Sequence, residues 1–118
     1  MQTLYEHLVE EFAKEALKVG DIEVIIVYGS VARGEATEDS DLDLLIITSQ
    51  IDKVREKLSE IRTDLDLKYH TLITLVYRSP EQLFRGLREG NPFLRNILNE
   101  GRAIYARGIF KEIFKTSF

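Results

Sequence analysis

The chain has 118 residues, of which 44% are hydrophobic and 31% charged, a composition typical of a folded domain and not of a disordered chain. This length predicts a single domain spanning residues 1–118, with no second domain to hold a substrate. The absence of cysteine excludes disulfides and thiolate metal sites. No apolar run is long enough to span a membrane, and we expect a cytoplasmic protein.

The formal net charge of −4 conceals an acidic half and a basic half. Residues 1–66 carry 7 Lys and Arg against 16 Asp and Glu, a net charge of −9, whereas residues 67–118 carry 9 against 4, a net charge of +5. The basic half indicates either a salt-bridged helix surface or a docking surface for an acidic partner, including a second copy in a homodimer. The overall acidity argues against nonspecific nucleic-acid binding, which needs many contacts from Lys and Arg to phosphates.

The first part of the chain predicts a helix followed by two strands. Residues 3–19 are amphipathic at helical spacing and end before Gly20, a common helix terminator. Residues 22–28 are short, β-branched and nearly all apolar, which indicates a strand buried on both faces. A helical turn, a polar loop and a second strand are then predicted at residues 31–33, 35–40 and 41–48.

The rest of the chain predicts helices interrupted by short strands. Ser49 begins a helix that runs to about Arg62, and residues 63–68 connect it to a strand ending near Tyr77. Ser79-Pro80 and Asn91-Pro92 are strong helix starts, with a capping residue before a proline. An edge strand at residues 103–106 and a helical segment ending in Phe118 complete the chain. This order predicts an α/β (α+β) fold, with a short mixed sheet and helices packed on one side.

Two chemical features lie within residues 28–47, YGSVARGEATEDSDLDLLII. Gly29-Ser30 follows a buried strand and opens a helical turn, whose free N–H groups and serine hydroxyl suit a phosphate. Asp41 and Asp43 open the next strand on one face, with Cα atoms about 7 Å apart. Two such carboxylates repel each other unless a cation joins them, and their oxygen atoms suit Mg²⁺.

The spacing of the two features relates them. Ten residues separate Ser30 from Asp41, enough for the chain to turn back and make the two strands neighbours. The phosphate-binding turn would then lie beside the metal-binding carboxylates, as phosphoryl or nucleotidyl transfer requires. Arg33, on the same turn, is either a donor to a terminal phosphate or a solvent-facing side chain.

The pattern Gly-Ser, ten residues, Asp-x-Asp, with RGEA after the serine and SDLDLL at the carboxylates, resembles the minimal nucleotidyltransferases of the DNA polymerase beta-like superfamily. The resemblance implies a small nucleotidyltransferase fold in which Asp41 and Asp43 bind Mg²⁺ ions, with two ions expected. It implies that Gly29 and Ser30 contact ATP or another nucleoside triphosphate, and Arg33 and Ser40 complete the predicted nucleotide-binding set.

Members of this family that are active in transfer usually have a third carboxylate on the next strand. Asp66 has the expected apolar neighbours but lies early in the chain, near the predicted connection. Alignment on the helix start at Ser79 instead puts Thr74 in the position, and a threonine cannot replace a carboxylate as metal ligand or base. Asp66 and Thr74 are therefore the two candidates for this position, with Thr74 favoured because the apolar pattern sets strand register.

The predicted function is Mg²⁺-dependent transfer of a nucleoside monophosphate from ATP or another triphosphate to a hydroxyl. The resemblance implies a helical HEPN-domain toxin as partner, with this chain as its antitoxin. The alternative is a weakly active or inactive nucleotide-binding module that acts by binding its partner.

Overall fold

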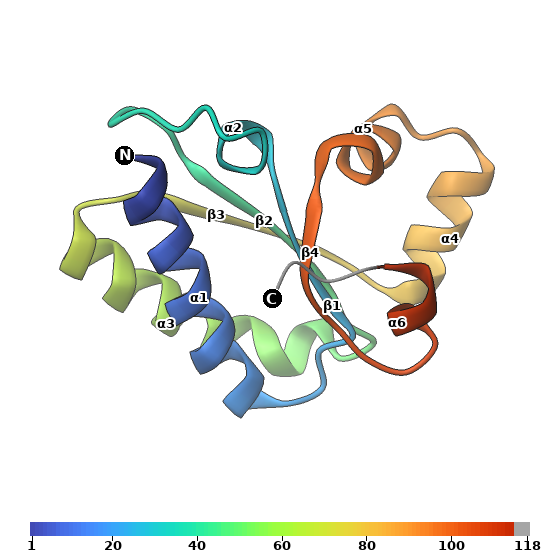
Figure 1. Cartoon of the computed structure of the whole chain (residues 1–118). Coiled ribbons are helices and arrows are strands. Elements are labelled where there is room, and N and C mark those ends of the chain that lie inside the picture. Colours follow the sequence, from blue (N-terminus) through green and yellow to red (C-terminus); the bar gives the residue numbers. More distant parts are fainter. Residues whose placement is uncertain (115–118) are drawn as a thin grey trace.

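The computed structural model describes residues 1–114 and shows a four-stranded mixed sheet with helices against it (Figure 1). The elements in chain order are α1 (Gln2–Val19), β1 (Val24–Tyr28), α2 (Gly29–Ala32), β2 (Leu42–Ile47), α3 (Ile51–Tyr69), β3 (Ile73–Arg78), α4 (Pro80–Arg88), α5 (Pro92–Glu100), β4 (Arg102–Ala106) and α6 (Phe110–Ile113). None of the helices in this part of the chain has both the length and the hydrophobicity that a membrane span requires.

The strand order across the sheet is β3-β2-β1-β4. β1 is antiparallel to both of its neighbours, β2 and β4, whereas β2 and β3 are parallel. A parallel pair needs a long crossover connection, and α3 provides it. The predicted α+β class and mixed sheet are therefore confirmed.

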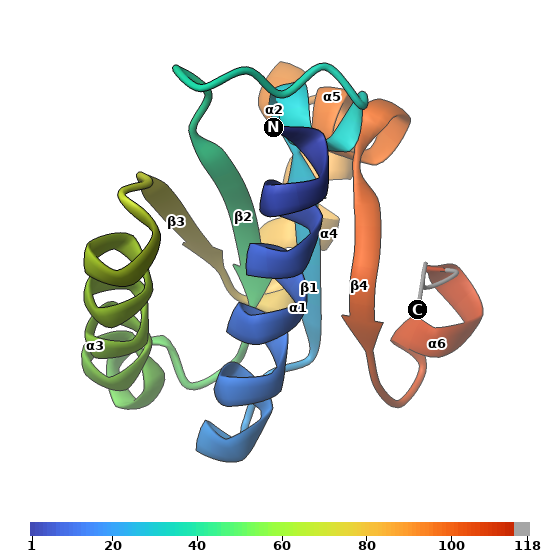
Figure 2. The ribbon, with the colours of Figure 1, turned by 60° about the vertical axis from the view of Figure 1, so that its left-hand side comes forward.

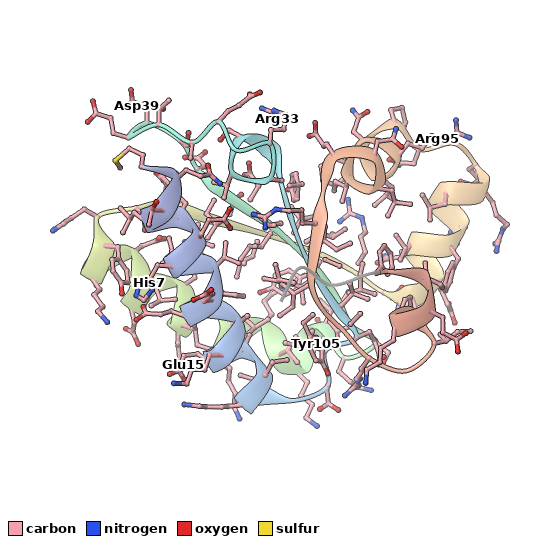
Figure 3. The ribbon with its side chains drawn as sticks, in the orientation of Figure 1. His7, Glu15, Arg33, Asp39, Arg95 and Tyr105 are labelled. Atoms are coloured by element: carbon pink, nitrogen blue, oxygen red, sulfur yellow. The ribbon has the colours of Figure 1, made fainter. Side chains whose placement is uncertain are left out.

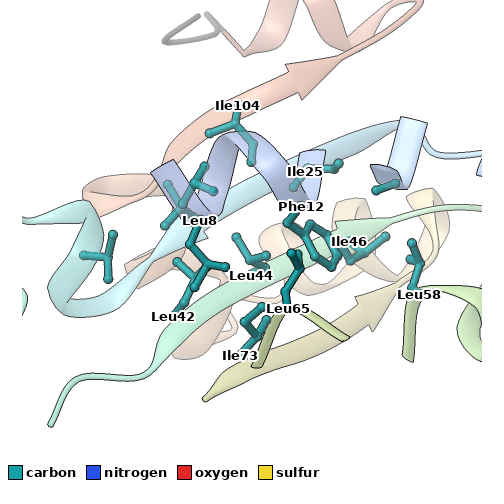
Figure 4. Packing of buried hydrophobic residues seen from close by; sticks show 14 of the residues in the cluster. Leu8, Phe12, Ile25, Leu42, Leu44, Ile46, Leu58, Leu65, Ile73 and Ile104 are labelled. Carbon is teal, nitrogen blue, oxygen red and sulfur yellow. The ribbon is translucent and has the colours of Figure 1, made fainter. Parts of the chain in front are cut away.

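Helices cover both faces of the sheet, which corrects the prediction that they pack on one side. Ile25 and Val27 of β1 point into a core shared with α1 and α3, part of which is seen in Figure 4. Val24 and Ile26 point the other way, into a second core that includes residues of α4, α5 and α6. A strand that is apolar at every position needs cover on both sides, so the composition of β1 already required two layers of helices.

Residues 63–68 were predicted to be a connection, but they are helical and belong to α3. α3 continues through them to Tyr69 because Leu65 extends its apolar stripe and is buried at 8% exposure. The helix ends at His70, which adopts the left-handed conformation with φ 55°. At the C-terminus α6 ends at Ile113, and Phe118, where the last segment was predicted to end, lies outside the described residues.

The two proline-containing helix starts are as predicted. The Ser79 hydroxyl accepts a hydrogen bond from the Gln82 N–H, while the Gln82 side chain accepts one from the Ser79 N–H. The Asn91 side chain accepts a hydrogen bond from the Leu94 N–H in the same way at the start of α5. These caps fix where the chain leaves β3 and enters the helices of the second face.

Candidate functional site

The predicted phosphate-binding turn and one of the predicted metal ligands lie in direct contact. β1 and β2 pair so that Tyr28, the last residue of β1, lies opposite Asp43. Gly29 follows with φ +74°, and a Cβ atom built on it would overlap the Asp43 carboxylate. Only glycine therefore fits here on both counts, conformation and space. The ten-residue spacing in the sequence does bring the two features together.

The turn itself offers backbone donors. α2 begins at Gly29 with Tyr28 extended before it as the N-cap residue, and the Arg33 N–H at its other end donates a hydrogen bond to the Gly29 carbonyl at 3.2 Å. The N–H groups of Gly29, Ser30 and Val31 precede that bond in the helix and have no acceptor within the helix. This arrangement can hold an anionic group next to Asp43.

The two aspartates differ in environment. Asp41 is exposed just before β2, whereas Asp43 is half-buried within the strand. Burial raises the pKa of the Asp43 carboxyl, and the neighbouring charge of Asp41 raises it further, while the hydrogen bond from Thr74 and the charge of Arg33 act in the opposite direction. A like-charge pair of this kind is stabilised by a cation between its members.

Thr74 occupies the position where the third carboxylate was sought. It lies opposite Asp43 in the β2–β3 pairing, and its hydroxyl donates a hydrogen bond of 2.5 Å to Asp43 Oδ1. The alternation of side chains puts Asp43 on the second face of the sheet, whereas Leu42 and Leu44 point into the first core.

Asp66 is not brought to this pair. It lies on α3, which covers the first face of the sheet, and its carboxylate accepts hydrogen bonds from the Ile73 N–H at 3.0 Å and the Thr71 hydroxyl at 3.0 Å. Asp66 thus joins the end of α3 to the start of β3, and among residues 1–114 it does not form a metal-binding group of three with Asp41 and Asp43. Of the two assignments, the structure favours Thr74.

Arg33 and Ser40, the remaining predicted nucleotide-binding residues, both have protein partners. Arg33 pairs with Glu35 and Glu100, each at 3.2 Å, and lies exposed beside α2 (Figure 3). The Ser40 hydroxyl accepts a hydrogen bond from the Thr37 N–H, and its carbonyl accepts one from the Tyr5 hydroxyl. Ser40 therefore shapes the loop before Asp41, and Arg33 would have to exchange its glutamates to reach a phosphate.

An aromatic cluster on the same sheet face was missed by the sequence analysis. The Phe93 ring at the start of α5 packs edge-on against Tyr28, with 5.7 Å between ring centroids. The Arg78 guanidinium lies over the Phe93 ring, 5.8 Å from the ring centroid. The Phe93 side chain is 37% exposed, and the Tyr28 ring that it contacts belongs to the residue paired with Asp43 in the sheet. Strand register and the packing of α5 against the sheet bring these three residues together, and sequence spacing provides neither.

The donor set fits a divalent cation in part. Asp41 and Asp43 supply carboxylate oxygens, the ligands that Mg²⁺ prefers. Residues 1–114 contain no group of three His, Cys, Asp or Glu side chains arranged to hold a metal ion. The protein thus offers two carboxylates, and a cation held there would need further oxygen ligands from substrate or water.

Comparisons with known proteins identify the family of the chain. The polymerase beta nucleotidyltransferase family model matches residues 8–109. Two relatives from Methanocaldococcus jannaschii, both named "Putative protein adenylyltransferase", are 40% identical over 103 residues and 32% identical over 115 residues. The first match covers 85% of this chain and 97% of the relative, and the second covers 92% and 77%.

Solved structures show the same fold. A crystal structure of a toxin–antitoxin with AMP-PNP contains a chain that superposes with a TM-score of 0.59 at 17% identity, covering 92% of this chain and 79% of that one. A crystal structure described as "a putative nucleotidyltransferase from Sulfolobus solfataricus" gives a TM-score of 0.54 at 18% identity, covering 90% of this chain and 84% of that one. With the family match over most of its length, the chain belongs to the polymerase beta nucleotidyltransferase family and is a nucleotidyltransferase of the minimal type.

Proposed function

We propose that this protein transfers a nucleoside monophosphate, with ATP as the first candidate donor, to a hydroxyl group on a partner protein. The observation that carries the proposal is the contact between Gly29 and Asp43, which sets a turn with free backbone donors directly against a half-buried carboxylate. The relatives named as protein adenylyltransferases support AMP as the group transferred and a protein as the acceptor.

Each site residue then has a defined task. The backbone N–H groups of Gly29 and Ser30, together with the Ser30 hydroxyl, would bind the β- and γ-phosphates. Thr74 would hold the Asp43 carboxylate in place through its hydroxyl. Arg33 would add positive charge at the mouth of the site once a phosphate replaces its glutamate partners.

Asp41 and Asp43 would together hold Mg²⁺, which in such a site neutralises phosphate charge and assists the departure of pyrophosphate. With Thr74 in place of a carboxylate, no protein base stands at that position to take the proton of the acceptor hydroxyl. We therefore expect slow transfer, in which orientation and charge neutralisation contribute more than proton abstraction.

The partner we propose is a helical HEPN-type toxin, with this protein as its antitoxin. The toxin–antitoxin structures among those with the same fold support this choice. The acceptor hydroxyl would come from the partner.

Label transfer tests the proposal. The protein is incubated with α-³²P-labelled ATP, MgCl₂ and a purified HEPN-domain protein, and label on protein is measured after electrophoresis. We expect labelling by the native chain, loss of at least 90% of it in the Asp41→Asn/Asp43→Asn double variant, and retention in Asp39→Asn. Asp39→Asn is the matched control because Asp39 is exposed on the loop before the site. Labelling that is unchanged in the double variant would contradict the assigned roles.

The second candidate function is binding without transfer, and the Thr74 substitution is the observation that favours it. In that case the chain binds nucleotide and its partner but transfers no label. Persistent partner binding by both the native and the double-variant chain, with no label on either protein, would support this function over the first.

A further inference from the structure

A groove of about 340 Å³ runs between α3 and the edge strand β3, on the side of the sheet that α1 and α3 cover. Arg55, Ser59 and Arg62 line its helix wall, and Leu72, Leu75 and Tyr77 lie along its strand wall. Figure 2 shows β3 as the outer strand with α3 beside it. Ile73 and Thr74 also line the groove, so it adjoins the candidate site through Thr74, whereas Gly29, Ser30, Arg33, Asp41 and Asp43 are not part of its lining.

The helix wall is rich in hydrogen-bond donors and carries positive charge. Within residues 1–114 neither Arg55 nor Arg62 forms an ion pair, and the groove lining described there contains no carboxylate. The Arg55 guanidinium lies over the Tyr77 ring, 5.3 Å from its centroid. The Tyr77 hydroxyl is buried and has no hydrogen-bond partner among the described residues. Two guanidiniums and two hydroxyls without an acid between them are suited to an anionic group.

The strand wall has unused backbone groups. The Leu72 and Arg78 carbonyls accept hydrogen bonds from backbone N–H groups at the two ends of β2, so the even-numbered residues of β3 face that strand. The backbone groups of the odd-numbered residues therefore face the open edge. Two of these groups have side-chain partners, because Asp66 binds the Ile73 N–H and the Arg78 guanidinium donates to the Tyr77 carbonyl at 2.8 Å. Leu75 lies between them, and within residues 1–114 no strand lies beside it because β3 ends the sheet. The groups that remain, from the Ile73 carbonyl to the Tyr77 N–H, can pair with an added strand.

A second copy of this chain is a poor occupant of the groove. If two β3 edges paired about a twofold axis, Arg55 and Arg62 of the two copies would be brought to the same interface. Like charges brought together in this way are repulsive and oppose edge-to-edge pairing. The positive charge of Arg55 and Arg62 instead favours a strand that carries negative charge.

We propose that the α3–β3 groove binds an extended acidic segment of a partner protein, which adds to β3 as a fifth strand and places carboxylates on Arg55 and Arg62. The two arginines are seven positions apart in the helix, about 10 Å along its axis. Alternate residues of an extended chain are about 7 Å apart, so acidic residues two to four positions apart reach both guanidiniums. This binding does not depend on nucleotidyl transfer.

Selection from a library of random octapeptides displayed on phage, with the purified full chain as bait, tests the proposal. We expect enriched peptides to carry Asp or Glu at two positions spaced two to four residues apart, among residues that favour strands. The most enriched peptide is then synthesised with a fluorescent label, and its affinity is measured by anisotropy.

Three variants assign the binding to the groove. Arg55→Ala/Arg62→Ala should weaken binding of the labelled peptide at least tenfold, whereas Lys57→Ala, on an exposed position of the same helix, should change it less than twofold. Replacing the peptide's acidic residues by Gln should also weaken binding at least tenfold, and methylating alternate backbone nitrogens should abolish it. Circular dichroism and thermal unfolding check that the variants are folded.

Several results would overturn the proposal. They are the enrichment of neutral or basic peptides, the absence of any enrichment, and equal loss of affinity in Lys57→Ala and the double variant. Full binding of the N-methylated peptide would show an anion pocket without strand addition. Tighter binding of a single-stranded RNA octamer than of the enriched peptide would assign the groove to nucleic acid instead.

Discussion

At Gly29, both the backbone conformation and the neighbouring Asp43 side chain disfavour any residue other than glycine. Its φ of +74° disfavours any side chain, and a Cβ atom would also overlap the Asp43 carboxylate. We predict that Gly29→Ala lowers the free energy of unfolding by about 2–4 kcal/mol, from the strained backbone and the overlap together. Urea denaturation of the purified protein measures this loss.

Gly34→Ala is the matched control, since Gly34 has nearly the same φ, +75°, but no atom within 4 Å of the position of its Cβ. It should lose only about 1–2 kcal/mol. Adding Asp43→Ala to Gly29→Ala should recover part of the larger loss, because the overlapping carboxylate is then gone. Equal losses in the two glycine variants would contradict the proposed contact.

Thr74 is the residue that sets the expected rate of transfer. Thr74→Asp places a third carboxylate opposite Asp43, where it can bind a cation and accept a proton from the acceptor hydroxyl. We predict that this change raises Mg²⁺-dependent label transfer by roughly tenfold or more. Asparagine has nearly the same size as aspartate but no charge, so Thr74→Asn should give no increase in label transfer. An equal rise in both variants would show that charge is not the cause.

Asp43 is expected to reduce stability in the absence of a cation. Because its pKa is raised in the folded protein, mainly by burial, the ionised side chain destabilises the native state. Asp43→Asn should therefore increase the free energy of unfolding at neutral pH in EDTA. The variant should be more stable than the native chain at every pH above the raised pKa of Asp43, where the native side chain is ionised. The difference should disappear as the pH falls below the unfolded pKa of about 3.9, because Asp43 is then neutral, as asparagine is. A variant less stable than the native chain at pH 7 would contradict this.

Among the elements, the junction from α3 to β3 depends on one carboxylate. Asp66 accepts hydrogen bonds from the Ile73 N–H and the Thr71 hydroxyl just beyond the left-handed residue that ends the helix. We predict that Asp66→Ala lowers the free energy of unfolding by about 1–3 kcal/mol, the usual loss for hydrogen bonds to a charged group. Asp64→Ala, two residues earlier and exposed, should change it by less than about 0.5 kcal/mol.

The same variant separates structure from catalysis. If Asp66 joins two elements and takes no part in the site, label transfer by folded Asp66→Ala should stay within about twofold of the native rate when stability is corrected for. Loss of transfer without loss of stability would restore Asp66 to the site.

The elements were predictable where local chemistry determines them. Ser79 and Asn91 cap their helices through their own side chains, so the sequence contains the whole signal. The end of α3 was missed because its last turns carry polar residues around a single buried leucine, Leu65. Its stop is a left-handed His70 rather than a glycine, and nothing in the sequence marks that conformation.

The site was predictable in part for a related reason. Gly29, Ser30, Asp41 and Asp43 lie on two consecutive strands and their turn, so spacing alone brings them together. Thr74 and the aromatic cluster around Phe93 depend on how β3 and α5 are placed against β1 and β2. Strand register and helix packing decide such contacts, and these follow from the whole core rather than from a motif.

At the scale of the whole molecule, the acidic and basic halves of the sequence are joined to each other. Arg102 of β4 binds Glu6 of α1 at 2.7 Å, and Arg107 binds Glu23 at 2.8 Å. Arg33 and Glu100 form a third bridge, with the signs of charge reversed. Part of the basic surface predicted to meet an acidic partner is therefore paired within the chain. Arg55 and Arg62 of the α3–β3 groove, which form no ion pair within residues 1–114, lie in the acidic half instead.

These pairs should contribute to stability as couplings between distant parts of the chain. Glu6 and Arg102 are 96 positions apart, and about a third of each side chain is exposed, 35% and 30%. A double-mutant cycle with Glu6→Gln and Arg102→Gln should give a coupling of about 0.5–1 kcal/mol, and 1 M salt should reduce it.

The cycle with Glu10→Gln in place of Glu6→Gln is the control, because Glu10 is exposed on the same helix and should show no coupling to Arg102. Equal couplings in the two cycles would indicate a general charge effect, and a coupling confined to Glu6 would show that this ion pair stabilises the packing of α1 against β4.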